Sequence, residues 1–155
     1  MIPATEMTEM IDGKSFDRPD LTAHQRFVDF KLWMTFVNRL NRDNLTTQLF
    51  PNELKLDDHT TVKPNIFICA EKAPLLIVEA DHSEVKLAKY QASAVPEHWV
   101  VEQDKNTVTT HILVDGAYVS TVYQSGDAIP IGLDDQLTIS VDKLFRIDYS
   151  DEKLV

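Results

Sequence analysis

The sequence predicts an α+β fold, in which a mixed sheet is flanked by helices and followed by a C-terminal β meander. The run LLIVEA at Leu75–Ala80 is almost continuously apolar, as expected of a central strand that is covered on both faces. Residues 21–42 and Ser83–Ala94 carry helical patterns. After His98, short strand-like segments alternate with turn signals, which indicates a series of paired strands.

The composition favours one domain that spans residues 1–155. Of the 155 residues, 43% are hydrophobic, which is enough for one sizeable core. No run approaches the roughly 18 apolar residues of a membrane-spanning helix, and the N-terminus lacks the basic start and apolar core of a signal peptide. Cys69 is the only cysteine and cannot form a disulfide within the chain, so we expect a cytoplasmic protein.

The N-terminal part predicts a hairpin followed by a long helix. Asp12-Gly13 is a strong turn signal within Glu9–Phe16, and Asp20 or Thr22 can cap the helix at 21–42. Apolar residues recur along this helix at three- and four-residue steps and predict one buried stripe. The stripe comprises Phe27, Phe30, Met34, Val37 and either Leu40 or Asn41.

The same helix is basic in a chain whose formal charge is −10. That charge argues against a protein that coats nucleic acid non-specifically, because phosphates are repelled at long range. The helix therefore presents either a solvated outer face or a local surface for a phosphate backbone. The basic residues are Arg26, Lys31, Arg39 and Arg42.

The middle of the chain predicts the strands around the central run. Residues 45–56 are interrupted by Pro51, which indicates an edge strand or two short strands. Val62–Ala70 is predicted as one strand, and Ser83 is a candidate cap for the helix that Val95-Pro96 ends. The later strands are predicted at His98–Gln103, Thr107–Val114, Ala117–Tyr123 and Gln136–Ser140, with a last helical turn at Val141–Phe145.

Carboxylates at the end of the central run are the first candidates for chemistry. Glu79 shares its strand face with Ile77 and Asp81, because side chains alternate along a strand. A carboxylate directly after LLIV needs a partner, since a buried unpaired charge is costly. That partner is either a divalent metal ion, which carboxylates bind with water and phosphate, or a lysine, Lys86 or Lys89, in a plain ion pair.

Six segments form a pattern that resembles the Uma family of restriction-type endonucleases, within the PD-(D/E)XK superfamily. The most specific of them are K-L-A-K-Y followed in register by A-V-P-E-H-W-V-V. The segments are Glu9–Lys14, Ala23–Arg26, Lys63–Ile66, Ala73–Glu79, Lys86–Tyr90 and Ala94–Val101.

The resemblance implies a restriction-endonuclease-like core and a metal-dependent DNA endonuclease. In such sites an aspartate and a glutamate bind Mg²⁺ or Mn²⁺, and a lysine completes the centre. Carried over by position, the glutamate is Glu79, the lysine is Lys86 and the aspartate position is Asn65. Accessory positions are Glu9, Lys89 and Gln25. A homodimer is implied as well, so that two sites cut the two DNA strands.

Two features depart from the family pattern. Asn65 replaces the aspartate, and an amide oxygen brings no charge to a metal. Only residues 80–85 separate the glutamate from the lysine, where the family has a longer loop. Asp81 could supply the missing carboxylate, and His82 is either a base or polar surface. The alternative to an active nuclease is therefore a catalytically inactive homologue that acts as a binding or regulatory protein.

Overall fold

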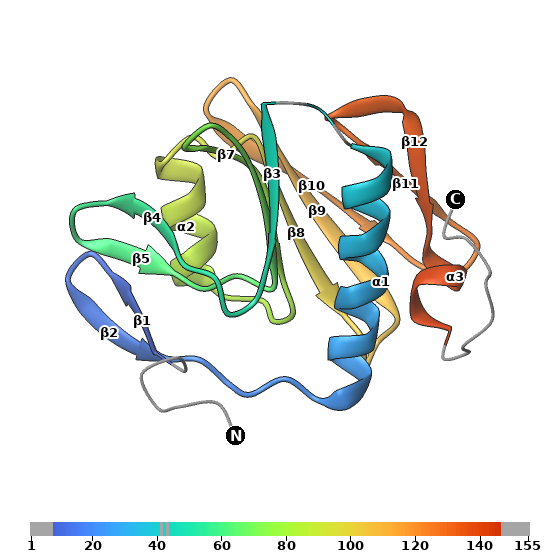
Figure 1. Cartoon of the computed structure of the whole chain (residues 1–155), viewed down its shortest axis with the longest axis horizontal. Helices are drawn as coiled ribbons and strands as arrows, with labels where there is room; N and C mark the ends of the chain where they lie inside the picture. Colours follow the sequence, from blue (N-terminus) through green and yellow to red (C-terminus); the bar gives the residue numbers. More distant parts are fainter. Residues whose placement is uncertain (1–7, 41, 43, 147–155) are drawn as a thin grey trace.

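A six-stranded mixed sheet forms the centre of the computed structural model, which describes residues 8–40, 42 and 44–146 (Figure 1). Its strand order is β10-β9-β8-β7-β6-β3, and only β7 and β8 run parallel. The helix α2 (Glu84–Ala92) connects these two strands, so the centre is a β-α-β unit. The strands are β3 (Leu45–Leu49), β6 (Ile66–Ala70), β7 (Ala73–Glu79), β8 (Glu97–Glu102), β9 (Thr107–Val114) and β10 (Ala117–Tyr123).

Smaller elements cover the two faces of this sheet (Figure 1). A four-stranded sheet of order β2-β1-β5-β4 lies on the side of α2, whereas α1, α3 and the antiparallel pair β11–β12 lie on the other side. The bounds are β1 (Thr8–Ile11), β2 (Lys14–Asp17), α1 (Ala23–Arg39), β4 (Leu54–Asp57), β5 (Thr60–Val62), β11 (Ala128–Ile131), β12 (Asp134–Ser140) and α3 (Val141–Phe145).

The strand β7 contributes to two separate hydrophobic clusters. Leu76 and Val78 belong to the larger cluster with α1, α3 and β12, whereas Ile77 belongs to the cluster with Tyr90 of α2. All three are fully buried, as predicted for a central strand covered on both faces. Because side chains alternate, Glu79 ends the strand on the same face as Ile77 and points toward α2.

The predicted fold class is confirmed: the structure is α+β, with a mixed sheet, flanking helices and a C-terminal strand hairpin. Thr22 caps α1 and Ser83 caps α2, each accepting a hydrogen bond from a backbone N–H three residues on. One strand prediction was wrong. Val62–Ala70 is divided, because residues 63–65, around Pro64, leave one sheet and cross to the next; proline has no N–H to continue a ladder.

The predicted buried stripe of α1 was also wrong. Phe30 is 51% exposed, and Met34 and Val37 are each 37% exposed. Leu40 is buried as predicted, and its alternative, Asn41, lies outside the described residues. The buried apolar residues before Leu40 lie on another face, at four-residue steps, and are Val28, Leu32 and Phe36. The helix is apolar around much of its circumference, so helical spacing alone allows more than one stripe, and packing against the sheet selects between them.

Three of the four basic side chains of this helical region contact the protein itself. The Lys31 ammonium donates to the carbonyls of Lys143 and Arg146 at 2.5 and 3.0 Å, where α3 ends. Arg42 donates to the Leu133 carbonyl, and Arg26 pairs with Asp20. These contacts favour a structural role over a phosphate-binding surface. Among the described residues, no helix has the length and apolarity needed to cross a membrane.

Candidate functional site

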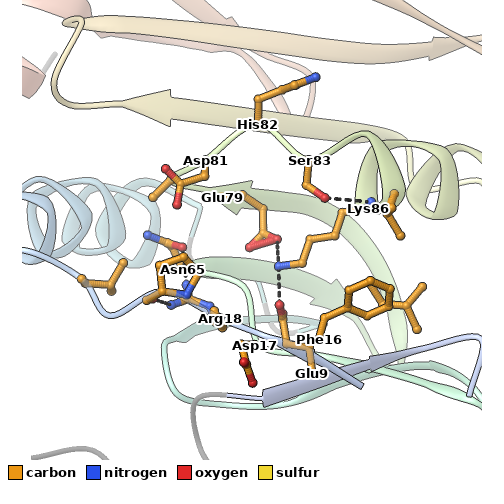
Figure 2. A pocket seen from close by; sticks show the side chains of 15 residues that line it. Glu9, Phe16, Asp17, Arg18, Asn65, Glu79, Asp81, His82, Ser83 and Lys86 are labelled. Carbon is orange, nitrogen blue, oxygen red and sulfur yellow. Dashed lines mark hydrogen bonds and ion pairs between the residues drawn. The ribbon is translucent and has the colours of Figure 1, made fainter. Parts of the chain in front are cut away.

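A cavity of about 250 Å³ lies where the end of β7, the start of α2 and the β1–β2 hairpin meet (Figure 2). The predicted acids and lysine line this cavity together with polar groups from three other segments. The residues that matter for the chemistry are Glu9, Arg18, Asn65, Glu79, Asp81 and Lys86. The fold therefore assembles one polar cavity from parts of the chain that are far apart in sequence.

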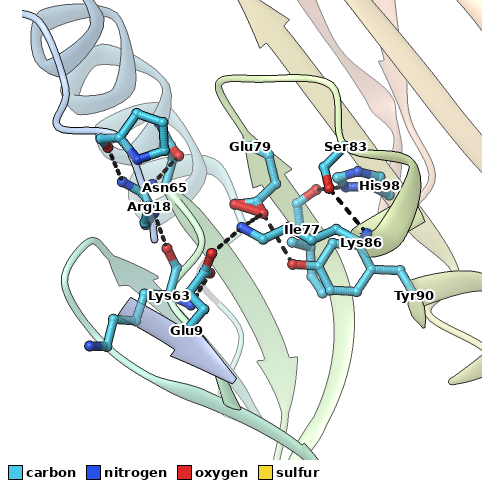
Figure 3. A network of polar contacts seen from close by, with 11 residues as sticks. Glu9, Arg18, Lys63, Asn65, Ile77, Glu79, Ser83, Lys86, Tyr90 and His98 are labelled. Atoms are coloured by element: carbon cyan, nitrogen blue, oxygen red, sulfur yellow. Dashed lines mark hydrogen bonds and ion pairs between the residues drawn. The ribbon is translucent and has the colours of Figure 1, made fainter. Parts of the chain in front are cut away.

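The Lys86 ammonium group lies between two buried glutamates (Figure 3). Its Nζ is 2.6 Å from Glu9 Oε1 and 2.5 Å from Glu79 Oε2. Ser83 caps α2 so that Lys86 falls in the first turn, and Tyr90 follows four residues later on the same face. The Tyr90 hydroxyl donates to Glu79 Oε2 at 3.1 Å, and the backbone N–H of Lys63 donates to Glu9 Oε2 at 2.6 Å.

Lys86 and its two partners form a buried triad, Glu9–Lys86–Glu79, in which burial and charge shift the pKa values of Glu79 and Lys86. Burial raises the pKa of the Glu79 carboxyl above its ordinary value, and the Lys86 charge opposes that rise. Burial alone would lower the pKa of Lys86, but the two neighbouring carboxylates raise it above its ordinary value. Burial and the Glu79 charge also hold the pKa of Tyr90 well above 10, so its hydroxyl stays a neutral donor. Lys86 is therefore a permanent ammonium group in the cavity wall.

A second polar set lies across the cavity and is centred on Asn65. Arg18 donates from Nη2 to Asn65 Oδ1 at 2.5 Å and from Nε to the Lys63 carbonyl at 2.7 Å. The Asn65 amide nitrogen donates to Asp29 Oδ2 at 2.7 Å, and Gln25 donates to Asp29 Oδ1 at 2.8 Å. Both ends of the Asn65 side chain are therefore engaged by charged groups.

Asp29 and Arg18 are as buried as the glutamates, at 2% and 6% exposed. Burial raises the pKa of Asp29 to about 6, although the hydrogen bonds from Asn65 and Gln25 act against this rise. The Arg18 guanidinium also stacks over the Phe50 ring, 4.2 Å from its centroid. Charge, hydrogen bonds and an aromatic face together fix Arg18 in place.

The structure brings the main predicted site residues together. Glu9, Asn65, Glu79 and Lys86 all line the cavity, and Gln25 joins them through Asp29. The sequence left open whether Lys86 or Lys89 would form an ion pair with Glu79. In the structure the partner is Lys86.

Other predicted residues lie at the margin or elsewhere. Asp81 and His82 line the cavity but are exposed, because β7 ends at Glu79 and its alternation stops there. Lys89 is not part of the cavity: its ammonium group lies 2.6 Å from both Asp12 and Asp57.

No sequence pattern indicated a functional role for Arg18, Asp29 or Tyr90. Arg18 stands next to Pro19 in what reads as a loop after a hairpin, and Asp29 is a single acid within an apolar helix. Of the three, Tyr90 alone could have been found from the sequence, because it lies four residues after Lys86 and therefore shares its helix face.

The donor set allows a magnesium-type ion at the two glutamates. Among the described residues, no group of three or more His, Cys, Asp or Glu side chains is arranged to hold a metal. Mg²⁺, however, is often held by one or two carboxylates together with water and substrate phosphate. Glu9 and Glu79 supply two carboxylates at one wall of the cavity, with the Lys86 ammonium group between them, so a metal ion would share these carboxylates with Lys86. Asn65 does not add to it as the chain stands, because Arg18 uses its amide oxygen.

Comparison with known proteins gives a match in structure. No family model and no curated protein matches the sequence. The fold matches a crystal structure of a "putative nuclease" of family DUF820 from Anabaena variabilis, with a TM-score of 0.73 and 17% identity over 93% of each chain. Identity this low shows a shared fold, and membership of the Uma family stays a prediction. The chain thus shares nearly its whole fold with a protein described as a "putative nuclease".

Proposed function

We propose that this protein is a metal-dependent DNA endonuclease that hydrolyses phosphodiester bonds. The observation that carries the proposal is the buried Glu9–Lys86–Glu79 triad, which opens on a cavity. The fold shared with a protein described as a "putative nuclease" supports it. A homodimer that presents one site to each DNA strand belongs to the same proposal.

Glu9 and Glu79 are the residues that would hold Mg²⁺ or Mn²⁺. When bound, such an ion supplies a Lewis acid and lowers the pKa of its bound water. Lys86 keeps its proton and places a positive charge in the cavity wall, where it can stabilise the negative charge that develops on phosphate oxygens. Tyr90 fixes the orientation of the Glu79 carboxylate through its hydroxyl group.

Cleavage of supercoiled plasmid with Mn²⁺ tests this proposal. We expect nicked and linear products from the wild-type protein and at least about a hundredfold slower cleavage by Glu79→Gln, because the negative charge of a proposed metal ligand is lost. Glu102→Gln is the matched control, since Glu102 pairs with Lys105 at the surface away from the cavity. Intact plasmid after prolonged incubation with excess wild-type protein and Mn²⁺ would refute the proposal.

The Arg18–Asn65 hydrogen bond favours a second candidate, a nuclease fold that binds DNA or another partner without cutting. In that case Arg18 and Lys86 together would neutralise the site permanently. This candidate predicts no cleavage and no rise in melting temperature when Mn²⁺ is added. A rise that disappears in Glu79→Gln would exclude it.

A further inference from the structure

Arg18 brings a fixed positive charge into the candidate site. It lies next to Asn65, the position at which the resemblance to the Uma family implies an aspartate. Its guanidinium donates to Asn65 Oδ1 at 2.5 Å, so it lies within ligand distance of the only side-chain oxygen at that position. We propose that Arg18 is a resident cation which competes with a divalent metal ion for this side of the cavity. The inference rests on the proposed function, because it concerns the affinity of the same site for its metal.

The net charge of Arg18 and Asn65 equals that of an aspartate with a bound divalent metal ion, so Arg18 can replace the metal electrostatically. A carboxylate at position 65 and a divalent ion would together bring a net charge of +1, whereas Asn65 and Arg18 together also bring +1. The two buried glutamates and Lys86 on the opposite wall then experience the same net charge with no metal bound. Buried carboxylates need such compensation, since a buried unpaired charge is costly.

The position of Arg18 is built into the fold. Its Nε donates to the Lys63 carbonyl at 2.7 Å, its guanidinium stacks on Phe50, and only 6% of the residue is exposed. Asp29 accepts a hydrogen bond from the Asn65 amide nitrogen, which turns the amide oxygen toward Arg18. A metal that used this oxygen would have to displace a guanidinium group that is also held by the Lys63 carbonyl and the Phe50 ring.

This arrangement predicts that two substitutions act together on metal affinity. In Asn65→Asp alone, the new carboxylate would form an ion pair with Arg18 and would remain unavailable to a metal. In Arg18→Gln alone, the oxygen at position 65 would be released but would carry no charge. Only the double variant, Arg18→Gln with Asn65→Asp, would offer a third carboxylate that faces Glu9 and Glu79 across the cavity.

Mn²⁺ binding, measured by calorimetry and by the shift in melting temperature, tests the inference without any nuclease substrate. The wild-type protein, both single variants and the double variant are compared, with Arg26→Gln as the control because it removes a surface arginine. We expect the double variant to bind Mn²⁺ on the order of 10–100-fold more tightly than the wild type, the range typical of a change in a metal's ligand environment. Each single variant and the control should stay within about threefold of the wild type.

Equal affinity of the double variant and the wild type would overturn the inference, and so would an Asn65→Asp variant that binds as tightly as the double variant. If Arg18→Gln prevents folding, Arg18→Met retains an unbranched stem against Phe50 and takes its place in both arms. The two proposals fail separately. Tight Mn²⁺ binding by the double variant, together with intact plasmid after incubation with the wild-type protein, would contradict nuclease activity and still support the competition with Arg18.

Discussion

Lys86 and Lys89 lie three residues apart on α2, and each ammonium group contacts two carboxylates from other elements. Lys86 lies 2.6 and 2.5 Å from the two glutamates of the candidate site, and Lys89 lies 2.6 Å from Asp12 and from Asp57. The lysine side chains are almost equally exposed, at 13% and 15%. Their partners differ: the glutamates are 2% and 5% exposed, whereas Asp12 and Asp57 are 68% and 41% exposed.

The comparison shows that two contacts of similar length and connectivity can have different consequences. The Asp12 and Asp57 carboxylates keep much of their hydration, so removal of Lys89 leaves charges that water can solvate. The glutamates around Lys86 are cut off from water, so removal of Lys86 leaves buried charges without compensation. Lys86 therefore couples the stability of the fold to the cavity, and Lys89 ties the hairpins to α2 at the surface.

The largest expected effect is that of Lys86→Met. We expect the free energy of unfolding to fall by about 3–5 kcal/mol, as is typical when one partner of a buried ion pair is removed. Urea denaturation at pH 7 measures this change. Adding Glu79→Gln to Lys86→Met should recover part of the loss, because one buried charge is then removed; a further loss in the double variant would contradict this explanation.

As the pH is lowered, we expect the contacts on the buried side of α2 to lose stability at a higher pH than those on its surface side. His98 is 2% exposed, lies edge-on to Tyr90 and donates from Nδ1 to the Ile77 carbonyl at 3.1 Å. Burial lowers the pKa of His98 to about 3. Because this value lies below the unfolded value of about 6.5, the unfolded state binds the proton more tightly, and stability should fall as the pH is lowered from about 6.5 to 3.

The effect of His98 should amount to several kcal/mol, since one pKa unit corresponds to about 1.4 kcal/mol. Asp29 acts in the opposite direction between about pH 6 and 4, because its pKa is raised in the folded state.

On the surface side, the hydrogen bond from Lys89 is the main cause that lowers the pKa of Asp57 to about 2. The contact between Lys89 and Asp57 should therefore weaken only below about pH 4. Urea denaturation from pH 7 to 4 tests this order, with His82→Gln as the control because His82 is exposed. Because Asp29 can offset the loss in the wild type, the deciding comparison is with His98→Asn, and the same pH dependence in this variant as in the wild type would refute the role of His98.

The sequence predicted those parts of the fold that short-range signals determine. Asp12-Gly13 marked the first hairpin, Ser83 marked the start of α2, and the run around Ile77 marked the central strand. The buried face of α1 was not predictable, because apolar residues surround much of that helix and only the sheet decides which of them pack.

Only those residues of the candidate site that belong to a local sequence motif could be predicted from the sequence. Glu79 and Lys86 are close in sequence, so strand alternation and helix capping place both at one edge of the sheet. Arg18 meets Asn65 across 47 residues and Asn65 meets Asp29 across 36. Contacts between such distant segments depend on how the hairpin, α1 and the crossing at Pro64 pack, and no local pattern encodes them.

The smallest expected effect is that of Lys89→Met, the counterpart of Lys86→Met on the same helix. The helix keeps a residue of high helical propensity, and the two aspartates regain water. We expect a melting temperature close to that of the wild type, and a difference that shrinks further at 1 M NaCl, because salt screens exposed charges. Thermal unfolding of the wild type and of both lysine variants, at low and at high salt, measures the contrast. If Lys89→Met lost as much stability as Lys86→Met, the burial of the partner carboxylates would not be what separates the two lysines.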